Sequence, residues 1–227
     1  MDARENIADV LVKQLRSGRF TDQQIYIGTV TDPYQPVERK YLLTRQILKV
    51  LKDFHNPVSI LTKSDLVLRD LDLLKQLKNV DVNFTITTLD EKWAKLTEPF
   101  APTINQRLRT IEQLSNNNIH VFVMMGPYWP IFTDPEKLFK KFKEIGVVRV
   151  FTESFNTYGG NFSGVEDVLI KHYPELLLKI KSILFDKKKF YEFYSDAKKN
   201  VEKLSADYFL PTTIYFGLGH AGKFKNN

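Results

Sequence analysis

Residues 25–39 read IYIGTVTDPYQPVER, a stretch in which an apolar run passes directly into two threonines, an aspartate and two prolines. The run from Ile25 to Val30 is typical of a buried strand, and Pro36 suits the first turn of a helix. A strand that ends in a polar loop and leads into a helix is one unit of a parallel α/β sheet. The stretch therefore predicts the fold class, and the rest of the chain repeats the pattern.

Four further segments have the composition of buried strands, being short apolar runs rich in β-branched and aromatic residues: Val58–Leu61, Val80–Ile86, His120–Met125 and Val147–Phe151. Strand starts recur every ~25 to 40 residues with a helical stretch in each gap, so right-handed crossovers would join them into one parallel sheet. An expected helix, Arg4–Arg16, precedes the first strand. We therefore expect one strand to be missing upstream.

Helix signals lie between the strands. One helix is predicted from about Pro36 and another after Asp70, with apolar faces formed by Val37, Tyr41, Leu48, Leu51, Leu74 and Leu77. Three threonines stand three positions before a Glu or Gln, which is the capping-box pattern of a helix start: Thr88, Thr103 and Thr133. The helix after Thr133 has Pro135 in its first turn and should end at Gly146.

The composition is that of a globular protein with one sizeable core. Of the 227 residues, 43% are hydrophobic and 26% are charged, and no apolar run approaches the ~20 residues of a membrane helix. The N-terminal residues are charged and unlike a signal peptide, so we expect a cytoplasmic protein with no membrane partner. The sequence contains no cysteine, which excludes disulfides, thiolate metal sites and cysteine-held iron–sulfur clusters on this chain.

Basic charge is concentrated near the end of the chain. The net charge is +6, and residues 171–227 carry 11 basic against 6 acidic residues. We expect an α/β domain over residues 1–170 and a helical extension over residues 171–227 that packs on it. The lysines could contact nucleic-acid phosphates while aromatic residues stack on bases, or the aromatic residues could pack inward with the lysines in solvent. The aromatic residues concerned are Phe185, Phe190, Tyr191 and Tyr194.

Polar residues or prolines follow every predicted strand. The strand ends read GTVTDP, LTKSD, FTITTLD, MMGPYWP and FTESFN. In parallel α/β folds, function collects where the carboxyl ends of the strands meet the loops. These five loops should therefore face one another around a common mouth.

The motifs in this order resemble a known family. GTVTDPYQPVER, ILTKSDLVLRDLDLL, ITTLDEKWAKLTEPFAPTINQRL and GPYWP are similar to the radical S-adenosylmethionine proteins related to spore photoproduct lyase, over roughly Asp2 to Asn156. The resemblance implies a partial (β/α)6 barrel and a four-iron four-sulfur cluster, held by a CxxxCxxC segment, that binds and reductively cleaves S-adenosylmethionine. The resulting radical abstracts hydrogen from a substrate. By this comparison the chain lacks the first strand and the cysteine segment, so it does not bind the cluster by itself.

The resemblance also implies cofactor-binding residues. Thr31 and Asp32 would lie against the methionyl or ribose part of S-adenosylmethionine, and Lys63, followed by Ser64, would reach its carboxylate or the substrate. Thr29 stands where the lyase has a hydrogen-donating cysteine. Because a threonine O–H bond is too strong for that step, thymine-dimer repair by that route is not expected. The remaining implied contacts are Thr85, where the lyase has a serine, and Glu153 and Asn156, which would reach ribose.

The same residues also have structural interpretations. Asp32 before Pro33 is a common turn start, Lys63 would be a solvated loop lysine, and Thr85 favours a strand. Thr88 would be a helix cap only. Glu98 and Arg107 would pair to brace their loop.

Two other sequence patterns do not predict a binding site. GLGHAG, residues 217–222, matches a dinucleotide-binding fingerprint, but no βαβ unit with a following helix is expected there. The four histidines have no metal-ligand spacing, so no metal site is expected: His55, His120, His172 and His220.

Two functions follow from these features. By the resemblance, the chain would be the core of a radical S-adenosylmethionine enzyme, lyase-like and with an unidentified substrate, for which a nucleic acid and DNA repair are one option. Alternatively, it is a degenerate barrel that binds a small molecule or a nucleic acid without catalysis. The missing strand would expose a sheet edge beside the first predicted strand, so we expect either a homodimer or aggregation through that edge.

Overall fold

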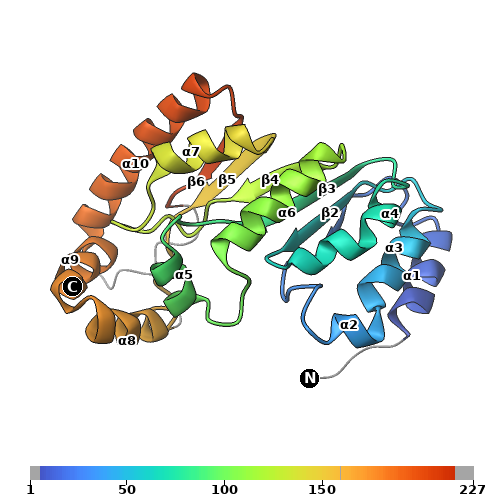
Figure 1. Cartoon of the computed structure of the whole chain (residues 1–227), viewed down its shortest axis with the longest axis horizontal. Coiled ribbons are helices and arrows are strands. Elements are labelled where there is room, and N and C mark those ends of the chain that lie inside the picture. Colours follow the sequence, from blue (N-terminus) through green and yellow to red (C-terminus); the bar gives the residue numbers. More distant parts are fainter. Residues whose placement is uncertain (1–5, 159, 218–227) are drawn as a thin grey trace. The chain divides into compact units, whose positions relative to one another are not determined.

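The computed structural model describes residues 6–158 and 160–217. Six strands form one sheet in the order β1-β2-β3-β4-β5-β6, and helices connect them (Figure 1). The pairs β1–β2, β2–β3 and β5–β6 are parallel, which confirms the predicted α/β class. The chain divides into two compact units, Met1–Phe84 with Asn105–Phe122, and Thr85–Ile104 with Val123–Asn227.

The first unit holds the first three strands, with fully buried apolar side chains on one of their faces. Val58 is 1% exposed, and Ile60 and Val82 are 0% exposed. Helices α3 and α4 lie on one side of these strands in Figure 1, and α1 packs on α3. The elements are α1 (Ile7–Arg16), β1 (Ile25–Ile27), α2 (Glu38–Tyr41), α3 (Leu43–Leu51), β2 (Val58–Thr62), the 3₁₀ helix η1 (Asp65–Asp70), α4 (Leu71–Leu74), β3 (Val80–Thr85) and α6 (Ile104–Asn116).

The second unit is built around an aromatic core. The Trp93 ring stacks on Phe132 with centroids 3.7 Å apart, and Trp129 meets Trp93 edge-on at 5.5 Å.

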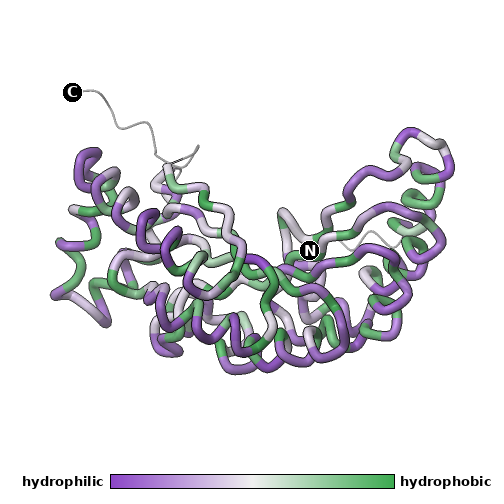
Figure 2. The backbone as a smooth tube through the Cα atoms, turned by 90° about the horizontal axis from the view of Figure 1, so that it is seen from above, coloured by the Kyte–Doolittle hydropathy of each residue, from purple (hydrophilic) through white to green (hydrophobic). Residues whose placement is uncertain are grey.

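Hydrophobic and hydrophilic residues alternate along the helical parts of the chain, as Figure 2 shows. The elements are α5 (Glu91–Thr97), β4 (His120–Met124, which begins in the first unit), α7 (Pro135–Glu144), β5 (Arg149–Glu153), α8 (Ser163–His172), α9 (Pro174–Phe185), α10 (Lys187–Asp207) and β6 (Thr212–Tyr215).

The segment after residue 170 contributes a strand as well as helices. β6 pairs with β5, with Val150 opposite Thr212, and this sixth strand was not among the five predicted ones. The run TTIYF is only five residues long and follows a 21-residue helix, α10. Its pairing partner β5 is distant in sequence, so only tertiary contact identifies it as part of the sheet. The glycine motif beyond Gly217 lies outside the described residues.

The predicted helix from Pro36 is two helices. Leu42 has φ of 53°, in the left-handed region, and separates α2 from α3. The new helix start is stabilised from outside, because a Glu38 oxygen accepts hydrogen bonds from the N–H groups of Thr44 and Arg45. After Asp70, similarly, only one α-helical turn forms, following the 3₁₀ helix η1.

Two of the predicted helix caps are wrong. Asp90 caps α5 by accepting from Trp93 N at 3.0 Å, and Asp134 caps α7 by accepting from Lys137 N at 3.2 Å. Thr88 and Thr133 instead donate to the carbonyl oxygens of Phe132 and Thr87, at 2.6 and 2.7 Å. An aspartate one or two residues later takes over the cap, and the threonines tie two loops together. As predicted, α6 begins directly after Thr103, and Gly146 follows α7 with φ of 81°.

Candidate functional site

Asp32 joins the loop after β1 to the end of β2. One carboxylate oxygen accepts from Tyr34 N at 2.8 Å and from Thr62 Oγ1 at 2.7 Å, and the other accepts from Lys63 N at 2.8 Å. The bond to Tyr34 closes the turn expected of an aspartate before proline. A carboxylate has about four acceptor positions, so Asp32 uses most of its capacity inside the protein.

Gly28 allows the two strand ends to approach closely. Its φ is +95°, and a Cβ there would collide with the carbonyl oxygen of Leu61 and lie 2.7 Å from Pro33 Cδ. Only glycine satisfies both the backbone conformation and the available space. The loop that follows Gly28 therefore lies directly over the end of β2.

Thr29, Thr31, Asp32, Lys63 and Ser64 lie at the ends of β1 and β2, and we call this set the rim. The members of the rim differ in solvent exposure and in hydrogen bonding. Thr29 and Thr31 are exposed, whereas Lys63 and Ser64 are half-buried. Ser64 N donates to Thr62 Oγ1 at 2.9 Å, and the Ser64 hydroxyl accepts from Leu66 N at 3.3 Å as the cap of η1. The backbone at Lys63 and Ser64 is thus fixed by hydrogen bonds on both sides.

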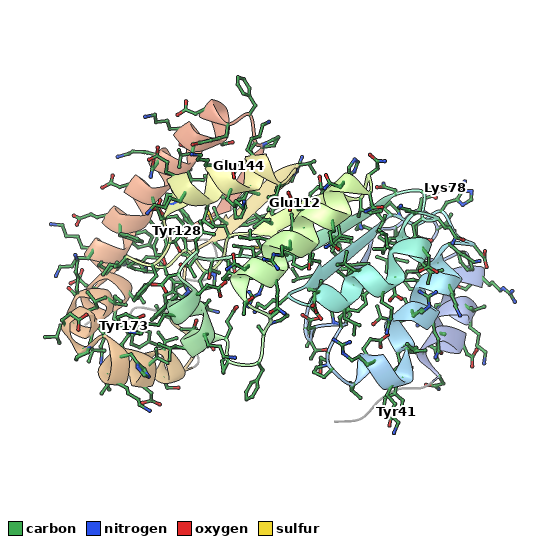
Figure 3. The ribbon with its side chains drawn as sticks, viewed as in Figure 1. Tyr41, Lys78, Glu112, Tyr128, Glu144 and Tyr173 are labelled. Carbon is green, nitrogen blue, oxygen red and sulfur yellow. The ribbon has the colours of Figure 1, made fainter. Side chains whose placement is uncertain are left out.

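A cavity of about 530 Å³ lies beside this rim. Its volume falls within the ~300–1,000 Å³ typical of small-molecule sites. The polar lining includes Thr31, Asp32, Glu38 and Thr44. The apolar lining comes from α1, β1 and the α2–α3 region: Ile7, Ile27, Val37, Leu43 and Ile47. Figure 3 shows Tyr41, which also lines the cavity, at the opposite end of the first unit from Lys78.

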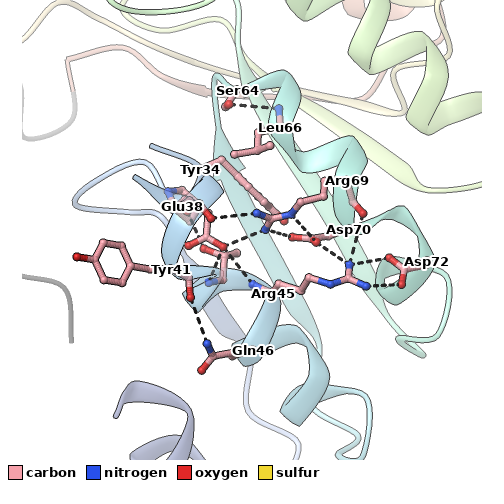
Figure 4. A network of polar contacts seen from close by, with 12 residues as sticks. Tyr34, Glu38, Tyr41, Arg45, Gln46, Ser64, Leu66, Arg69, Asp70 and Asp72 are labelled. Atoms are coloured by element: carbon pink, nitrogen blue, oxygen red, sulfur yellow. Dashed lines mark hydrogen bonds and ion pairs between the residues drawn. The ribbon is translucent and has the colours of Figure 1, made fainter. Parts of the chain in front are cut away.

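An ion-pair network that sequence analysis missed joins α2, α3, η1 and α4 (Figure 4). Asp70 is fully buried and accepts from Arg45 Nη1 at 2.8 Å and from Arg69 Nη2 at 2.7 Å. Arg45 also pairs with Asp72 at 2.7 Å, and Arg69 with Glu38 at 2.9 Å. A signal was present, because the charged run RDLD follows the strand-end motif LTKSD by only a few residues.

Glu38 belongs to both the network and the cavity lining. One carboxylate oxygen accepts from Arg69 Nη2 at 2.9 Å, from Thr44 N at 3.1 Å and from Arg45 N at 3.4 Å. The other oxygen accepts no hydrogen bond from any residue in the described part of the chain, although Glu38 is only 4% exposed. This oxygen is therefore an acceptor beside the cavity that the described residues leave unused.

Hydrogen bonds and burial determine the protonation states of the groups in and beside this network. The hydrogen bond from Arg45 lowers the pKa of Asp72 to about 2. Burial, followed by the charge of Asp70, raises the pKa of Tyr34, whose hydroxyl is buried without a hydrogen-bond partner among the described residues. At neutral pH, Asp72 is therefore ionised and Tyr34 is neutral.

The second unit carries the other predicted site residues. Glu153 is the last residue of β5 and lies against Gly126, where a Cβ would be 2.5 Å from Glu153 Cγ. The missing side chain at Gly126 leaves room for the glutamate. Asn156 Oδ1 accepts from Tyr158 N at 3.0 Å, and Thr85 is half-buried at the end of β3.

Tyr194 on α10 fixes the loop that contains GPYWP. Its hydroxyl donates to Tyr128 O at 2.9 Å and accepts from Phe155 N at 2.9 Å. Burial raises the pKa of Tyr194, and burial with the charge of Asp134 raises the pKa of Tyr128 to about 12. The Tyr194 phenol is neutral and bonds only to backbone groups, so this contact is a structural brace.

The aromatic residues of α9 and α10 divide into two groups. Phe190 and Tyr194 are 0% and 3% exposed, whereas Phe185 and Tyr191 are 44% and 47% exposed. Phe190 and Tyr194 cannot stack on bases while α10 stays packed. Lysines of α10 pair with acidic residues of the same helix: Lys188 with Glu192, Lys198 with Glu202, and Lys199 with Asp196.

The residues of this chain do not fit an iron–sulfur cluster. The sequence has no cysteine, and within residues 6–158 and 160–217 no group of three or more His, Asp or Glu could hold a metal. A cluster of this class requires thiolate ligands. No helix in the same ranges is long and apolar enough to cross a membrane.

The structure groups the predicted site residues into two sets. Thr31, Asp32, Lys63 and Ser64 lie along one rim of the first unit, with Thr29 adjoining them. Glu153 lies in the second unit with Thr85 and Asn156. The meeting of the two sets around one mouth, and the pairing of Glu98 with Arg107, stay predictions.

Comparison with known sequences identifies relatives for most of the chain. Residues 1–142 match the sequence model of the radical SAM superfamily. An uncharacterized protein of Methanocaldococcus jannaschii is 34% identical over 172 residues, covering 76% of this chain and 61% of its own length. An uncharacterized protein of Acidianus two-tailed virus is 31% identical, covering 71% of this chain and 56% of its own length. The chain thus spans little more than half of these relatives.

Comparison with solved structures shows the same fold. A spore photoproduct lyase variant superposes with a TM-score of 0.66 at 12% identity, covering 92% of this chain and 67% of the lyase chain. Streptococcus suis SuiB bound to S-adenosylmethionine superposes with a TM-score of 0.56 at 13% identity, covering 92% of this chain and 41% of SuiB.

Proposed function

This chain belongs to the radical SAM superfamily, and on that premise we propose that the rim of its first unit binds S-adenosylmethionine. The observation that carries the proposal is the cavity of about 530 Å³ at the GTVTDP strand end, where the lining residue Asp32 is hydrogen-bonded to Thr62 and Lys63 of the LTKSD end. Its position agrees with the rule that ligands of parallel α/β sheets bind at the carboxyl ends of the strands.

The chemistry of the lining suits this cofactor. S-adenosylmethionine presents an ammonium group, a sulfonium centre and ribose hydroxyls, all of which favour carboxylate and hydroxyl partners. Glu38 offers a carboxylate oxygen that no described residue uses, and Thr31 offers an exposed hydroxyl. Apolar side chains such as Ile27 and Val37 would cover the uncharged parts of the ligand.

Each rim residue has a definite part in this proposal. Asp32 positions the backbone of Lys63 and keeps the two strand ends together, while Lys63 supplies a cation at the rim for the carboxylate of the cofactor. Thr29 and Ser64 would contact the ligand from either side. In the second unit, Thr85, Glu153 and Asn156 stay candidates for the ribose and for the substrate.

Radical chemistry requires more than these residues. S-adenosylmethionine supplies a radical only after it receives an electron from a thiolate-held cluster, and these 227 residues contain no cysteine. The enzymatic proposal is therefore that this chain forms the cofactor-binding core of a radical SAM enzyme. The substrate stays open, because the titles of the structural neighbours name a dinucleoside spore photoproduct for the lyase and a precursor peptide for SuiB.

One observation favours a second candidate function. The absence of thiolates suits a barrel that retains ligand binding without catalysis, for a small molecule or a nucleic acid. Nucleic-acid binding through α10 is less favoured than small-molecule binding, because Phe190 and Tyr194 are buried.

Isothermal titration of the purified chain with S-adenosylmethionine tests the proposal. We expect saturable binding that a Thr31→Val variant weakens by roughly three- to tenfold, the loss of one hydrogen bond. Thr21→Val is the matched control, because Thr21 is also exposed in the first unit but lies outside the cavity lining. No saturable heat with the wild-type chain, or equal weakening by both variants, would remove the basis of the proposal.

A further inference from the structure

Strand β3 contains two residues that strands normally avoid. It reads VDVNFT, with Asp81 and Asn83 at alternate positions. In the strand order, β3 has a neighbour on each side, β2 and β4. Asp and Asn are among the residues most depleted in strands, so propensity alone would favour other side chains here. Residues that disfavour the strand in which they lie are often retained for a function, and Asp81 and Asn83 are such residues.

Both residues lie on the face of the sheet that does not carry the apolar core of the first unit. Side chains alternate between the two faces of a strand, and Val80, Val82 and Phe84 occupy the buried face. The register places Tyr26 opposite Ser59 and Ser59 opposite Asp81, so these three side chains form a row across β1, β2 and β3. At the β1 end of the row, Tyr26 is 66% exposed.

Ser59, Asp81 and Asn83 form a closed hydrogen-bond cluster. Asp81 Oδ1 accepts from Ser59 Oγ at 2.6 Å and from Asn83 Nδ2 at 2.6 Å. Asn83 Nδ2 also donates to Ser59 Oγ at 2.9 Å. The adjacent carboxylate fixes the amide orientation of Asn83, because only the nitrogen can donate to it.

Counting donors and acceptors shows what the cluster leaves unused. The Ser59 hydroxyl hydrogen and both amide hydrogens of Asn83 are engaged, so no donor remains. Asp81 Oδ2 and Asn83 Oδ1 accept no hydrogen bond from any described residue. Neither is among the described atoms that are fully buried without a partner, so both keep some accessible area, although Ser59 and Asn83 are each only 8% exposed. The cluster is therefore an acceptor-only surface.

The electrostatics of the cluster also lack a partner cation. Burial raises the pKa of Asp81, and the hydrogen bonds from Ser59 and Asn83 and the nearby His120 only partly oppose this. His120 is exposed at the start of β4, and no lysine or arginine of the described residues is among the groups that shift the pKa of Asp81. A carboxylate in this setting gains from a ligand that brings both hydrogen-bond donors and positive charge.

We propose that Ser59, Asp81 and Asn83 form a binding site for a protonated amine or guanidinium group of a ligand, with the exposed ring of Tyr26 as its flank. Parallel strands lie ~4.8 Å apart, so Tyr26 stands about 10 Å from Asp81, within reach of the rest of such a ligand. The site lies near the start of β2 and β3, away from the strand-end rim, and does not depend on cofactor binding there.

The site can be tested by NMR titration of the intact chain with methylguanidinium chloride. The prediction is saturable shifts of the Ser59, Asp81 and Asn83 backbone amides, and at least roughly tenfold weaker binding by the Asp81→Asn variant. This substitution keeps an oxygen that accepts from Ser59 and Asn83 but replaces the unused acceptor with a donor. Asp9→Asn is the matched control, since Asp9 is an exposed carboxylate elsewhere in the first unit.

Two further probes separate charge from hydrogen bonding. N-methylurea has the shape of methylguanidinium without its charge, and tetramethylammonium has the charge without N–H donors. Both should bind at least roughly tenfold more weakly than methylguanidinium. Equal binding of either probe, saturation by magnesium chloride instead, unchanged binding by Asp81→Asn, or no saturable shift at these residues would overturn the proposal.

Discussion

At the scale of single residues, Glu38 joins the ion-pair network to the lining of the cavity. It pairs with Arg69, accepts from the first N–H groups of α3 and lines the cavity, while being 4% exposed. A buried carboxylate of this kind stabilises the fold only while all its partners are present, because each of them would otherwise be desolvated without compensation.

The Glu38→Gln variant should be less stable by about 2 kcal/mol, since it removes one of the two carboxylates that pair with the Arg69 guanidinium and leaves only Asp70. Urea denaturation measures the change. Asp72→Asn is the matched control, because Asp72 also pairs with an arginine but is exposed, and its loss should be clearly smaller. Equal losses in the two variants would show that burial does not set the strength of this network.

Asp81 allows a prediction about pH. Because burial raises its pKa in the folded state, the folded protein is favoured while Asp81 is protonated and loses stability as pH rises through the folded-state pKa. The Asp81→Asn variant lacks this loss. It should therefore be more stable than wild type at pH 7, and the difference should shrink as pH falls toward the ordinary carboxyl pKa of about 3.9.

Urea denaturation at a series of pH values checks this, with Asp9→Asn expected to be slightly less stable than wild type at pH 7, because it removes a carboxylate from the first turn of α1. A variant less stable than wild type at pH 7 would mean that the carboxylate contributes to folding. That result would remove the argument that Asp81 is retained for binding.

At the scale of elements, α10 is connected to two loops by one hydroxyl. Tyr194 bonds to Tyr128 O and to Phe155 N, both in buried surroundings. Tyr194→Phe should cost about 2 kcal/mol of unfolding free energy, because two buried backbone groups lose a partner. Tyr158→Phe, at a position 63% exposed, should cost nearly nothing. Thermal or urea unfolding compares the two, and similar losses would contradict the assigned brace.

Elements differ in how well sequence predicts them. The strands at 58, 80 and 120 begin where predicted, because their apolar runs end in polar loops and need no distant partner to be recognised. The start of α3 depends on the Glu38 carboxylate, and the place of β6 in the sheet depends on its pairing with β5, so neither follows from local pattern. The caps at Asp90 and Asp134 were missed because two acceptors competed at each helix start and the threonines serve loop contacts instead.

The residues of the candidate site likewise divide into those that sequence predicted and those that it missed. The strand-end loops identified Asp32 and Lys63, and the structure joins them through a hydrogen bond from Lys63 N. Glu38 and the Ser59–Asp81–Asn83 cluster were not identified. A glutamate after a proline-rich loop resembles any surface residue, and strand-averse residues acquire meaning only when the register brings them together.

At the scale of the whole molecule, the chain combines the fold of a radical SAM protein with a sequence that has no thiolate. Anaerobic reconstitution of these 227 residues with iron and sulfide should leave the protein colourless after desalting, because thiolates are the cluster's ligands. Iron analysis and the visible spectrum measure this. A stable brown chromophore that stays with the protein would mean that other side chains hold iron.

The central claim is that the strand-end rim of this cysteine-free chain binds S-adenosylmethionine. A crystal structure of the chain grown with the cofactor tests it most directly. The account predicts the cofactor in the cavity beside Gly28 and Thr31, with its cationic part next to Glu38. A rim without ligand at saturating cofactor, or cofactor bound at the amino ends of the strands, would contradict it.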